Sequence, residues 1–170
     1  MKYLPVYLLI ILGVATRLLP HPANFTPLAA IALFGGMYLE KKWAILVPLI
    51  AIFASDFFIG FYSWPIMLSV YAGFAVAGLI GITLRENKKF HTILGGTLLG
   101  SMIFFALTNF AVWAFGTMYA HNLPGLLQCY YMAIPFFKNS LIGDLFYTGV
   151  LVGGMEFVIH TATLPVEQAL

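Results

Sequence analysis

The chain has 170 residues, of which 62% are hydrophobic and 8% are charged, and its formal net charge is +2. Soluble domains carry about 25% charged residues, so this composition excludes an ordinary soluble domain. It predicts an integral membrane protein with one transmembrane domain, residues 1–170, and no basic face for nucleic acid. The single cysteine, Cys129, excludes an internal disulfide.

Six apolar stretches predict an all-α bundle of six transmembrane helices. In chain order they are residues 3–19, 25–39, 43–61, 65–84, 92–116 and 139–160. A helix needs about 20 residues to cross the hydrocarbon core, so the second stretch is short. We expect neighbouring protein or a thinner bilayer to shelter its ends. The first stretch loosely resembles a cleaved signal peptide, but a transmembrane helix is the better interpretation.

Lysine and arginine in the connecting segments predict the orientation. Six crossings place both termini on the same side, and the basic residues are concentrated there. That side carries Lys2, Lys41, Lys42, Arg85, Lys88 and Lys89, and the opposite side carries Arg17 and Lys138. Both termini are therefore predicted to be cytoplasmic, in a multi-pass protein of the cell membrane.

The fifth connection, residues 117–138, is long and is predicted to face outward. The sequence Asn122-Leu123-Pro124-Gly125 is typical of a turn, and the apolar residues after it predict a separate short helix. Long connections often act as lids or binding loops. Two interpretations remain open: a lid that a ligand orders, or a helix that lies permanently on lipid.

Polar residues within the apolar stretches gather on one side of the predicted membrane. They are Arg17, Asn24, Asp56, Asn109, Trp113, Lys138, Asn139 and Asp144, and all eight fall in the outer half. Asp56, for example, lies thirteen residues after Trp43, which is about 20 Å along the helix. Charges at membrane depth are costly and usually functional, so this grouping predicts an outward-facing site for a polar or amphiphilic small molecule.

Each of these residues has an alternative role. Asp56 and Asp144 could neutralise Arg17 or Lys138, since buried charges are usually paired, or they could couple transport to protons or cations. Asn109 could join two helices through a hydrogen bond. Aromatic residues such as Trp113 and Tyr130 could be interfacial anchors or the wall of a ligand site, and Tyr130 is counted among the substrate-binding candidates.

Small residues recur every four positions in the last three stretches. These ladders are Gly73, Ala77 and Gly81; Gly96 and Gly100; and Gly149 and Gly153. Such spacing lets helix backbones approach closely in lipid. The ladders predict packing within the bundle, and the alternative is docking of a partner membrane protein.

Motifs for catalysis are missing from the sequence. It contains no nucleotide-binding P-loop, no zinc-protease motif and no serine-hydrolase motif. His21, His121 and Cys129 are all predicted on the outer side and could together bind a soft metal or a metal centre carried by a ligand. Their spacing resembles no known metal site, and ordinary loop residues are the better interpretation. We therefore expect a protein that is not an enzyme and that has no cofactor and no metal site.

Residues 17–36, with the sequence RLLPHPANFTPLAAIALFGG, resemble a small bacterial membrane family of unknown function. Further matching segments are Ser55-Asp56, Thr108-Asn109-Phe110, Gly125-Leu126, Cys129-Tyr130, residues 134–140 and Gly143-Asp144. That family is similar in turn to the substrate-binding (S) components of energy-coupling factor (ECF) vitamin transporters. This resemblance implies a six-helix protein of the inner membrane that captures a vitamin-like compound from outside. It also implies a transmembrane coupling subunit with two ATPases as partners.

Three functions therefore compete. The leading hypothesis is a substrate-binding transport protein like an ECF S component. The second is a stand-alone ion- or proton-coupled carrier that uses Asp56 and Asp144. The third is a membrane assembly factor that does not transport and whose polar residues only hold helices together.

Overall fold

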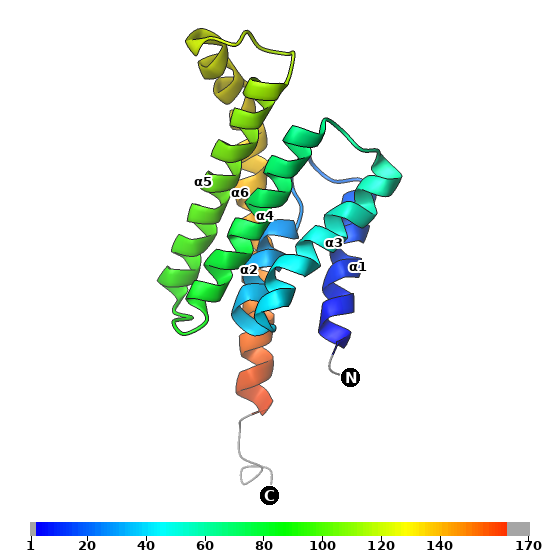
Figure 1. Ribbon diagram of the computed structural model, residues 1–170. Coiled ribbons are helices and arrows are strands. Elements are labelled where there is room, and N and C mark those ends of the chain that lie inside the picture. Colours follow the sequence, from blue (N-terminus) through cyan, green and yellow to red (C-terminus); the bar gives the residue numbers. More distant parts are fainter. Residues whose placement is uncertain (1–2, 163–170) are drawn as a thin grey trace, which may run out of the picture.

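The computed structural model describes residues 3–162, and this range folds into six α-helices (Figure 1). They are α1 (Leu4–Leu18), α2 (Leu28–Tyr38), α3 (Lys41–Ile59), α4 (Trp64–Leu84), α5 (Phe90–Phe115) and α6 (Leu123–Ala162). Four of them, α3 to α6, are long and apolar enough to cross a membrane, whereas α1 and α2 are shorter apolar helices. The predicted all-α class is confirmed, and the apolar helices support insertion into a membrane.

Helix α6 differs most from the prediction, because it begins at Leu123 and runs for 40 residues without interruption. Residues 122–125 form its start rather than a turn: the Asn122 side-chain oxygen accepts a hydrogen bond from the Gly125 N–H at 2.9 Å. Pro124 falls in the first turn, where its missing N–H costs nothing. The prediction of a separate short helix was therefore wrong.

The first part of α6 packs against the end of α5. The Tyr130 hydroxyl donates to the Ala106 carbonyl at 2.6 Å, and the Cys129 thiol lies 3.4 Å from the Asn109 carbonyl oxygen. Figure 1 shows these two helix ends rising together beyond the rest of the bundle. Most of residues 117–138, the segment predicted as a long outer connection with a short helix of its own, is thus one arm of a helical hairpin.

Helix α2 is the buried centre of the bundle. It begins at Leu28, later than predicted, and every residue from Ala30 to Met37 is buried. It packs against α3, α4 and α6. Its 11 residues span only about 16 Å, but Arg85 covers its C-terminal end by donating to the Gly36 and Leu39 carbonyls. Neighbouring protein therefore shelters this short helix, as predicted.

Glycines let α2 and α4 approach to backbone contact. A Cβ added at Gly81 would lie 2.1 Å from the Leu33 carbonyl oxygen, and one at Gly36 would lie 2.5 Å from the Gly78 carbonyl oxygen. The ladders on α4 and at Gly96 pack within the bundle, as predicted. The α6 ladder does not, because a Cβ at Gly149 or Gly153 would meet no atom within 4 Å.

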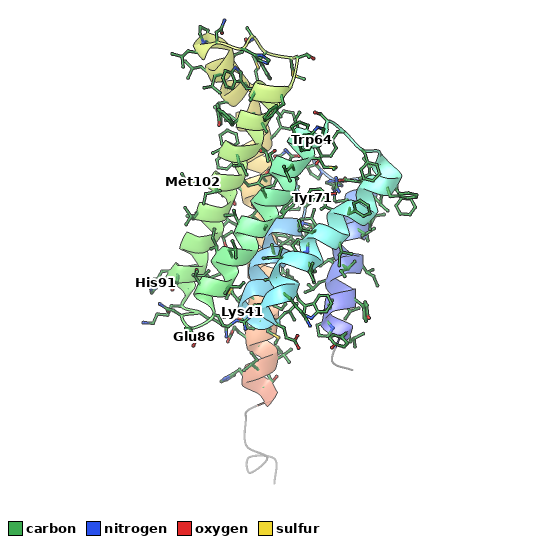
Figure 2. All side chains as sticks on the ribbon, in the orientation of Figure 1. Lys41, Trp64, Tyr71, Glu86, His91 and Met102 are labelled. Carbon is green, nitrogen blue, oxygen red and sulfur yellow. The ribbon has the colours of Figure 1, made fainter. Side chains whose placement is uncertain are left out.

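Basic residues gather at one end of the bundle. The start of α1, the α2–α3 turn, the α4–α5 connection and the end of α6 all lie there (Figure 1). Figure 2 shows Lys41, Glu86 and His91 at this end, while Trp64 lies toward the other end. The helices therefore alternate in direction, and the polar residues of the predicted outer half lie toward the end opposite Lys41, Lys42, Lys88 and Lys89 (Figure 1).

Candidate functional site

A cavity of about 580 Å³ lies in the half of the bundle away from Lys41 and Lys88. It is bordered by the end of α1, the segment between α1 and α2, the second half of α3, the first half of α4, the second half of α5 and the middle of α6. Its aromatic walls include Phe74, Phe104, Phe105, Phe136 and Phe137. Its polar lining consists of Arg17, His21, Asn24, Thr26, Tyr62, Ser101, Thr108, Asn109, Ser140 and Asp144.

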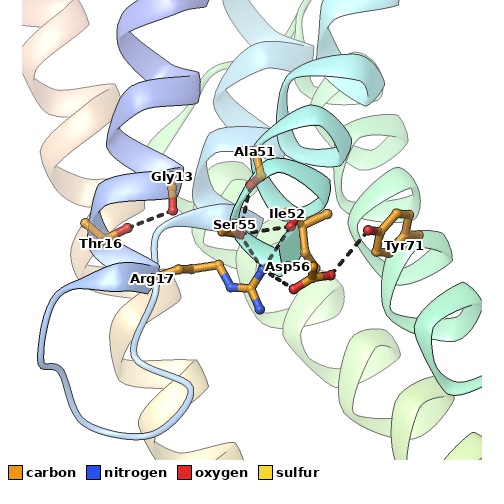
Figure 3. A network of polar contacts seen from close by, with 8 residues as sticks. All are labelled: Gly13, Thr16, Arg17, Ala51, Ile52, Ser55, Asp56 and Tyr71. Carbon is orange, nitrogen blue, oxygen red and sulfur yellow. Dashed lines mark hydrogen bonds and ion pairs between the residues drawn. The ribbon is translucent and has the colours of Figure 1, made fainter. Parts of the chain in front are cut away.

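Arg17 and Asp56 form a buried ion pair beside this cavity (Figure 3). Arg17 Nη1 lies 2.7 Å from Asp56 Oδ1, 2.5 Å from Ser55 Oγ and 3.2 Å from the Ile52 carbonyl oxygen. The other carboxylate oxygen accepts from the Tyr71 hydroxyl at 3.3 Å. Asp56 is fully buried and does not line the cavity. The structure thus favours the pairing interpretation for Asp56.

Arg17 differs from its partner because it faces the cavity. Its side chain keeps 17% of its accessible surface. Among the residues that the structure describes, all its hydrogen bonds use Nη1, which leaves the Nε and Nη2 donors for other groups. A guanidinium suits planar, bidentate recognition of carboxylates and phosphates, so Arg17 can hold an anionic group while Asp56 balances its charge.

Asp144 sits at the floor of the cavity and has no such partner. It is 7% exposed, and its Oδ2 lies 2.6 Å from Ser101 Oγ. No ion pair to Asp144 occurs among residues 3–162. Lys138 is exposed and lies six residues earlier on the same helix, which turns it about 120° away at 100° per residue. Pairing of Asp144 with Lys138, one of the sequence alternatives, is therefore wrong.

The two asparagines of the lining are held differently. Asn109 Nδ2 donates to the Phe105 carbonyl of its own helix at 2.8 Å, so its side chain does not tie two helices together and its Oδ1 remains an acceptor. Asn24 lies in the segment before α2 with a positive φ of 63°, a conformation that asparagine tolerates better than most residues. Thr26 follows it in the lining.

Tyr62 adds a hydroxyl from the short connection between α3 and α4. Partial burial, reinforced by the negative charge of Asp56, raises the pKa of Tyr62 to about 12. Since this value is far above neutral pH, the phenol stays protonated and can donate a hydrogen bond at the cavity edge.

Four of the nine residues predicted to bind substrate meet in the cavity, namely Arg17, Asn24, Asn109 and Asp144. The other five are Asp56, Trp113, Tyr130, Lys138 and Asn139, and none of them lines it. Trp113 Nε1 donates to the Ala120 carbonyl at 3.0 Å, in the connection that follows α5. Asn139 Nδ2 donates to the Ala23 carbonyl at 3.1 Å and so fastens the segment between α1 and α2.

Ser101 and Thr108 were missed by the sequence reasoning. Both lie on α5, on the helical face that also carries Phe105, Asn109 and Val112. A 3.6-residue period extended backward from Asn109 would have found Ser101. Single hydroxyl residues inside an apolar stretch give little signal without such a periodic argument.

The candidate metal ligands do not converge. His21 lines the cavity, the His121 ring lies 3.0 Å from the Gly116 carbonyl oxygen, and Cys129 is buried against α5. Within the described part of the chain, no three His, Cys, Asp or Glu side chains form a group that could hold a metal ion.

The chain was compared with models of known families. The family of unknown function DUF6580 matches residues 1–167, so the chain belongs to this family. The comparisons found no match among curated proteins and none among solved structures. The predicted resemblance to a family of unknown function is thereby confirmed.

Proposed function

We propose that this protein is a membrane transport protein that binds a small, vitamin-like or otherwise amphiphilic solute, in the manner of an ECF S component. The observation that carries the proposal is the cavity of about 580 Å³. Binding sites for small molecules typically enclose about 300–1,000 Å³, with mostly apolar walls and a few convergent polar groups. The phenylalanine walls and the polar lining described above fit that description.

The lining suggests which solutes would fit. Phe104, Phe105 and Phe137 offer flat apolar surfaces for a ring. Arg17 offers the two guanidinium nitrogens Nε and Nη2 at the side of the cavity, and Asn109 offers an amide oxygen. A solute with an aromatic or alicyclic body and a carboxylate or carbonyl group would use all of these contacts.

The proposal includes an orientation in the bacterial inner membrane. All six helices would cross or enter the bilayer, with both termini in the cytoplasm and the cavity open to the outside. The support is the excess of lysine and arginine at the end opposite the cavity. Helix α2 need not match the bilayer thickness, because it is surrounded by protein.

Labelling of introduced cysteines tests the orientation. Met118 and Glu86 are exposed at opposite ends of the bundle, and the buried Cys129 would be replaced by alanine. In intact cells, an impermeant thiol reagent should modify Met118→Cys and spare Glu86→Cys until the membrane is opened. Labelling of Glu86→Cys alone would reverse the orientation and place the cavity mouth in the cytoplasm.

Energy for transport would come from partners. An ECF-like protein would work with a transmembrane coupling subunit and two ATPases, and the lack of a P-loop in this sequence agrees with that division of labour. The second candidate function is a stand-alone carrier driven by an ion gradient. Asp144 favours it, because a buried carboxyl without an ionic partner is typical of ion and proton pathways in membranes. Uptake that collapses with the ion gradient, in cells without such ATPases, would favour this second function.

The experiment that tests binding is the identification of co-purified solutes. The protein is purified in mild detergent, denatured, and its released small molecules are compared by mass spectrometry with those from an unrelated membrane protein. We expect at least one amphiphilic compound, beyond common lipids, to be enriched with this protein. Finding only lipids common to both preparations would count against solute binding.

A further inference from the structure

The two sides of the cavity present different polar groups. The side formed by α1 and the α3–α4 connection includes hydrogen-bond donors, namely Nε and Nη2 of Arg17 and the protonated hydroxyl of Tyr62. The side formed by α5 and α6 carries Ser101, Thr108, Asn109, Ser140 and Asp144. Because both sides enclose the same space, the free donors and acceptors on each one indicate which groups a solute must bring.

The hydroxyl groups on the α5 and α6 side donate their protons to their own helices. Thr108 Oγ1 and Ser140 Oγ each donate to the carbonyl four residues earlier, at 2.8 Å and 3.2 Å. A hydroxyl has a single proton, so these two oxygens can only accept a hydrogen bond from a solute. Asn109 adds its Oδ1 as a further acceptor, because its Nδ2 donates to the helix backbone.

Asp144 gives this side of the cavity its charge. Its residue is 7% exposed, and Ser101 Oγ lies 2.6 Å from its Oδ2. No Lys, Arg or His pairs with Asp144 within residues 3–162, and the guanidinium of Arg17 already lies 2.7 Å from Asp56. A carboxylate held at membrane depth requires a compensating positive charge or a proton.

A smaller space deeper in the bundle does not supply that charge. Its volume is about 10 Å³, which is room for one water at most, and its walls are mostly apolar, with Ala30, Leu33 and Ala77 among them. A water there would satisfy the Thr148 hydroxyl, which is buried without a hydrogen-bond partner among the described residues. Water carries no charge, so a positive charge for Asp144 must come from the large cavity.

We propose that the solute carries a protonated nitrogen that binds Asp144, in addition to the carboxylate or carbonyl group that binds Arg17. This assignment rests on the proposed function, since it names the chemistry of the solute that the cavity takes. An ammonium group has three N–H donors and no acceptor. It therefore matches the carboxylate of Asp144 and the Ser140 oxygen, which lies one helical turn away on the same face.

The aromatic walls also suit a cation. Phe104 and Phe105 line the cavity, and the face of a phenylalanine ring attracts a positive charge. Since Arg17 and Asp56 neutralise each other, the ionised Asp144 leaves the cavity with a net negative charge. The substrate class is therefore an amphiphilic amine that has an anionic or carbonyl group at its other end.

A proton on Asp144 is the competing assignment. A neutral carboxyl group donates its proton to a hydroxyl or carbonyl oxygen of the solute, whereas a carboxylate accepts from an N–H group. The two states of Asp144 thus require different partners. Two probes that differ only in this partner group separate the two states.

The test compares para-(aminomethyl)benzoate with para-(hydroxymethyl)benzoate, together with the longer biphenyl analogues of both. Each pair shares its rings and its carboxylate, and differs only in an ammonium group against a hydroxyl group. Thermal unfolding of the full chain in mild detergent is measured against probe concentration, because a ligand that binds only the folded state raises the unfolding temperature. We expect the amine of at least one pair to bind at least about tenfold more tightly than its alcohol, the effect of one charge-assisted hydrogen bond.

Asp144→Asn and Glu156→Gln form the matched pair of variants. Each removes one carboxylate from α6, but Glu156 lies twelve residues later, about 18 Å along the helix, where it accepts from the Tyr38 hydroxyl. Asp144→Asn should bind the amine and the alcohol with equal affinity. Glu156→Gln should keep the preference of the wild-type protein for the amine.

Three results would overturn the assignment. Equal stabilisation of the wild-type protein by the amine and the alcohol would assign a proton to Asp144 and would leave solute binding itself intact. A preference for the amine that persists in Asp144→Asn would place the cation elsewhere in the cavity. Stabilisation by none of the probes would also reject an amine with a carboxylate, whereas the co-purified solutes decide separately whether the protein binds any solute.

Discussion

Asp56→Asn is expected to destabilise the folded protein by about 3–5 kcal/mol, the range found when one partner of a buried ion pair is removed. The substitution removes the negative charge that lies 2.7 Å from Arg17 Nη1 at the fully buried position 56. Arg17 would then keep a positive charge without its ionic partner. Asparagine has nearly the shape of aspartate, so the loss would come from charge rather than from packing. The measurement is the unfolding temperature and the yield of folded protein in detergent.

The double variant Arg17→Met with Asp56→Leu isolates the pair. Replacing both charges with apolar groups leaves neither one unpaired, so the double variant should recover much of the stability that Asp56→Asn loses. Asp144→Asn is the matched control: this carboxyl has no ionic partner among the described residues, and its neutralisation should not destabilise the protein. An Asp56→Asn protein as stable as wild type would show that the ion pair does not hold α1 to α3.

Gly81→Ala is expected to prevent folding or to reduce stability by at least about 3 kcal/mol, the upper end of typical overpacking penalties. The added Cβ would lie 2.1 Å from the Leu33 carbonyl oxygen. Because the obstacle is backbone and not a flexible side chain, α2 and α4 would have to separate. Helix α2 is the buried centre of the bundle, so this separation would disturb every neighbouring helix.

Gly95→Ala is the control for this substitution. Gly95 lies within α5, and a Cβ there would meet nothing within 4 Å. Alanine is favoured over glycine inside a helix by roughly 0.5–1 kcal/mol, so this variant should be as stable as wild type or slightly more so. Circular dichroism and thermal unfolding of the two variants compare them directly. Equal stability of Gly81→Ala and Gly95→Ala would contradict the close approach of α2 and α4.

The helices could largely be predicted, because apolar length and turn residues mark them directly. The start of α6 could not, for two physical reasons. Asn122-Leu123-Pro124-Gly125 has the chemistry of a turn and equally that of a helix start, in which Asn122 accepts from Gly125 and proline occupies the first turn. A helix of 40 residues also exceeds the roughly 20 that a bilayer requires, so bilayer thickness gives no reason to expect one.

The sequence predicted how far along each helix the cavity residues lie, but not which side of the helix faces the cavity. Depth along each helix brought Arg17, Asn24, Asn109 and Asp144 to one cavity, since position in the chain fixes how far a residue lies from a helix end. Rotation about the helix axis decides the rest. On α6 the cavity face carries residues 133, 136, 137, 140 and 144, and Lys138 and Asn139 lie off that face at the correct depth.

The hydroxyl residues that lie near Asp144 could not be identified from the sequence. Ser101, Thr97 and Thr148 are ordinary residues of membrane helices, and most such hydroxyls donate to their own helix backbone. Only the packing of α5 against α6 brings them around Asp144. The unpaired hydroxyl of Thr148 likewise depends on its rotamer, which no periodic pattern can predict.

Native mass spectrometry of three variants tests most directly whether the cavity of about 580 Å³ binds a solute. Ala133 lines the cavity, so Ala133→Phe fills part of it, whereas Val150 is exposed on the same helix, so Val150→Phe places the same ring away from it. Wild type and Val150→Phe should each carry one bound small molecule of the same mass, and Ala133→Phe should be folded but lack it. Identical spectra for all three proteins would contradict solute binding in this cavity.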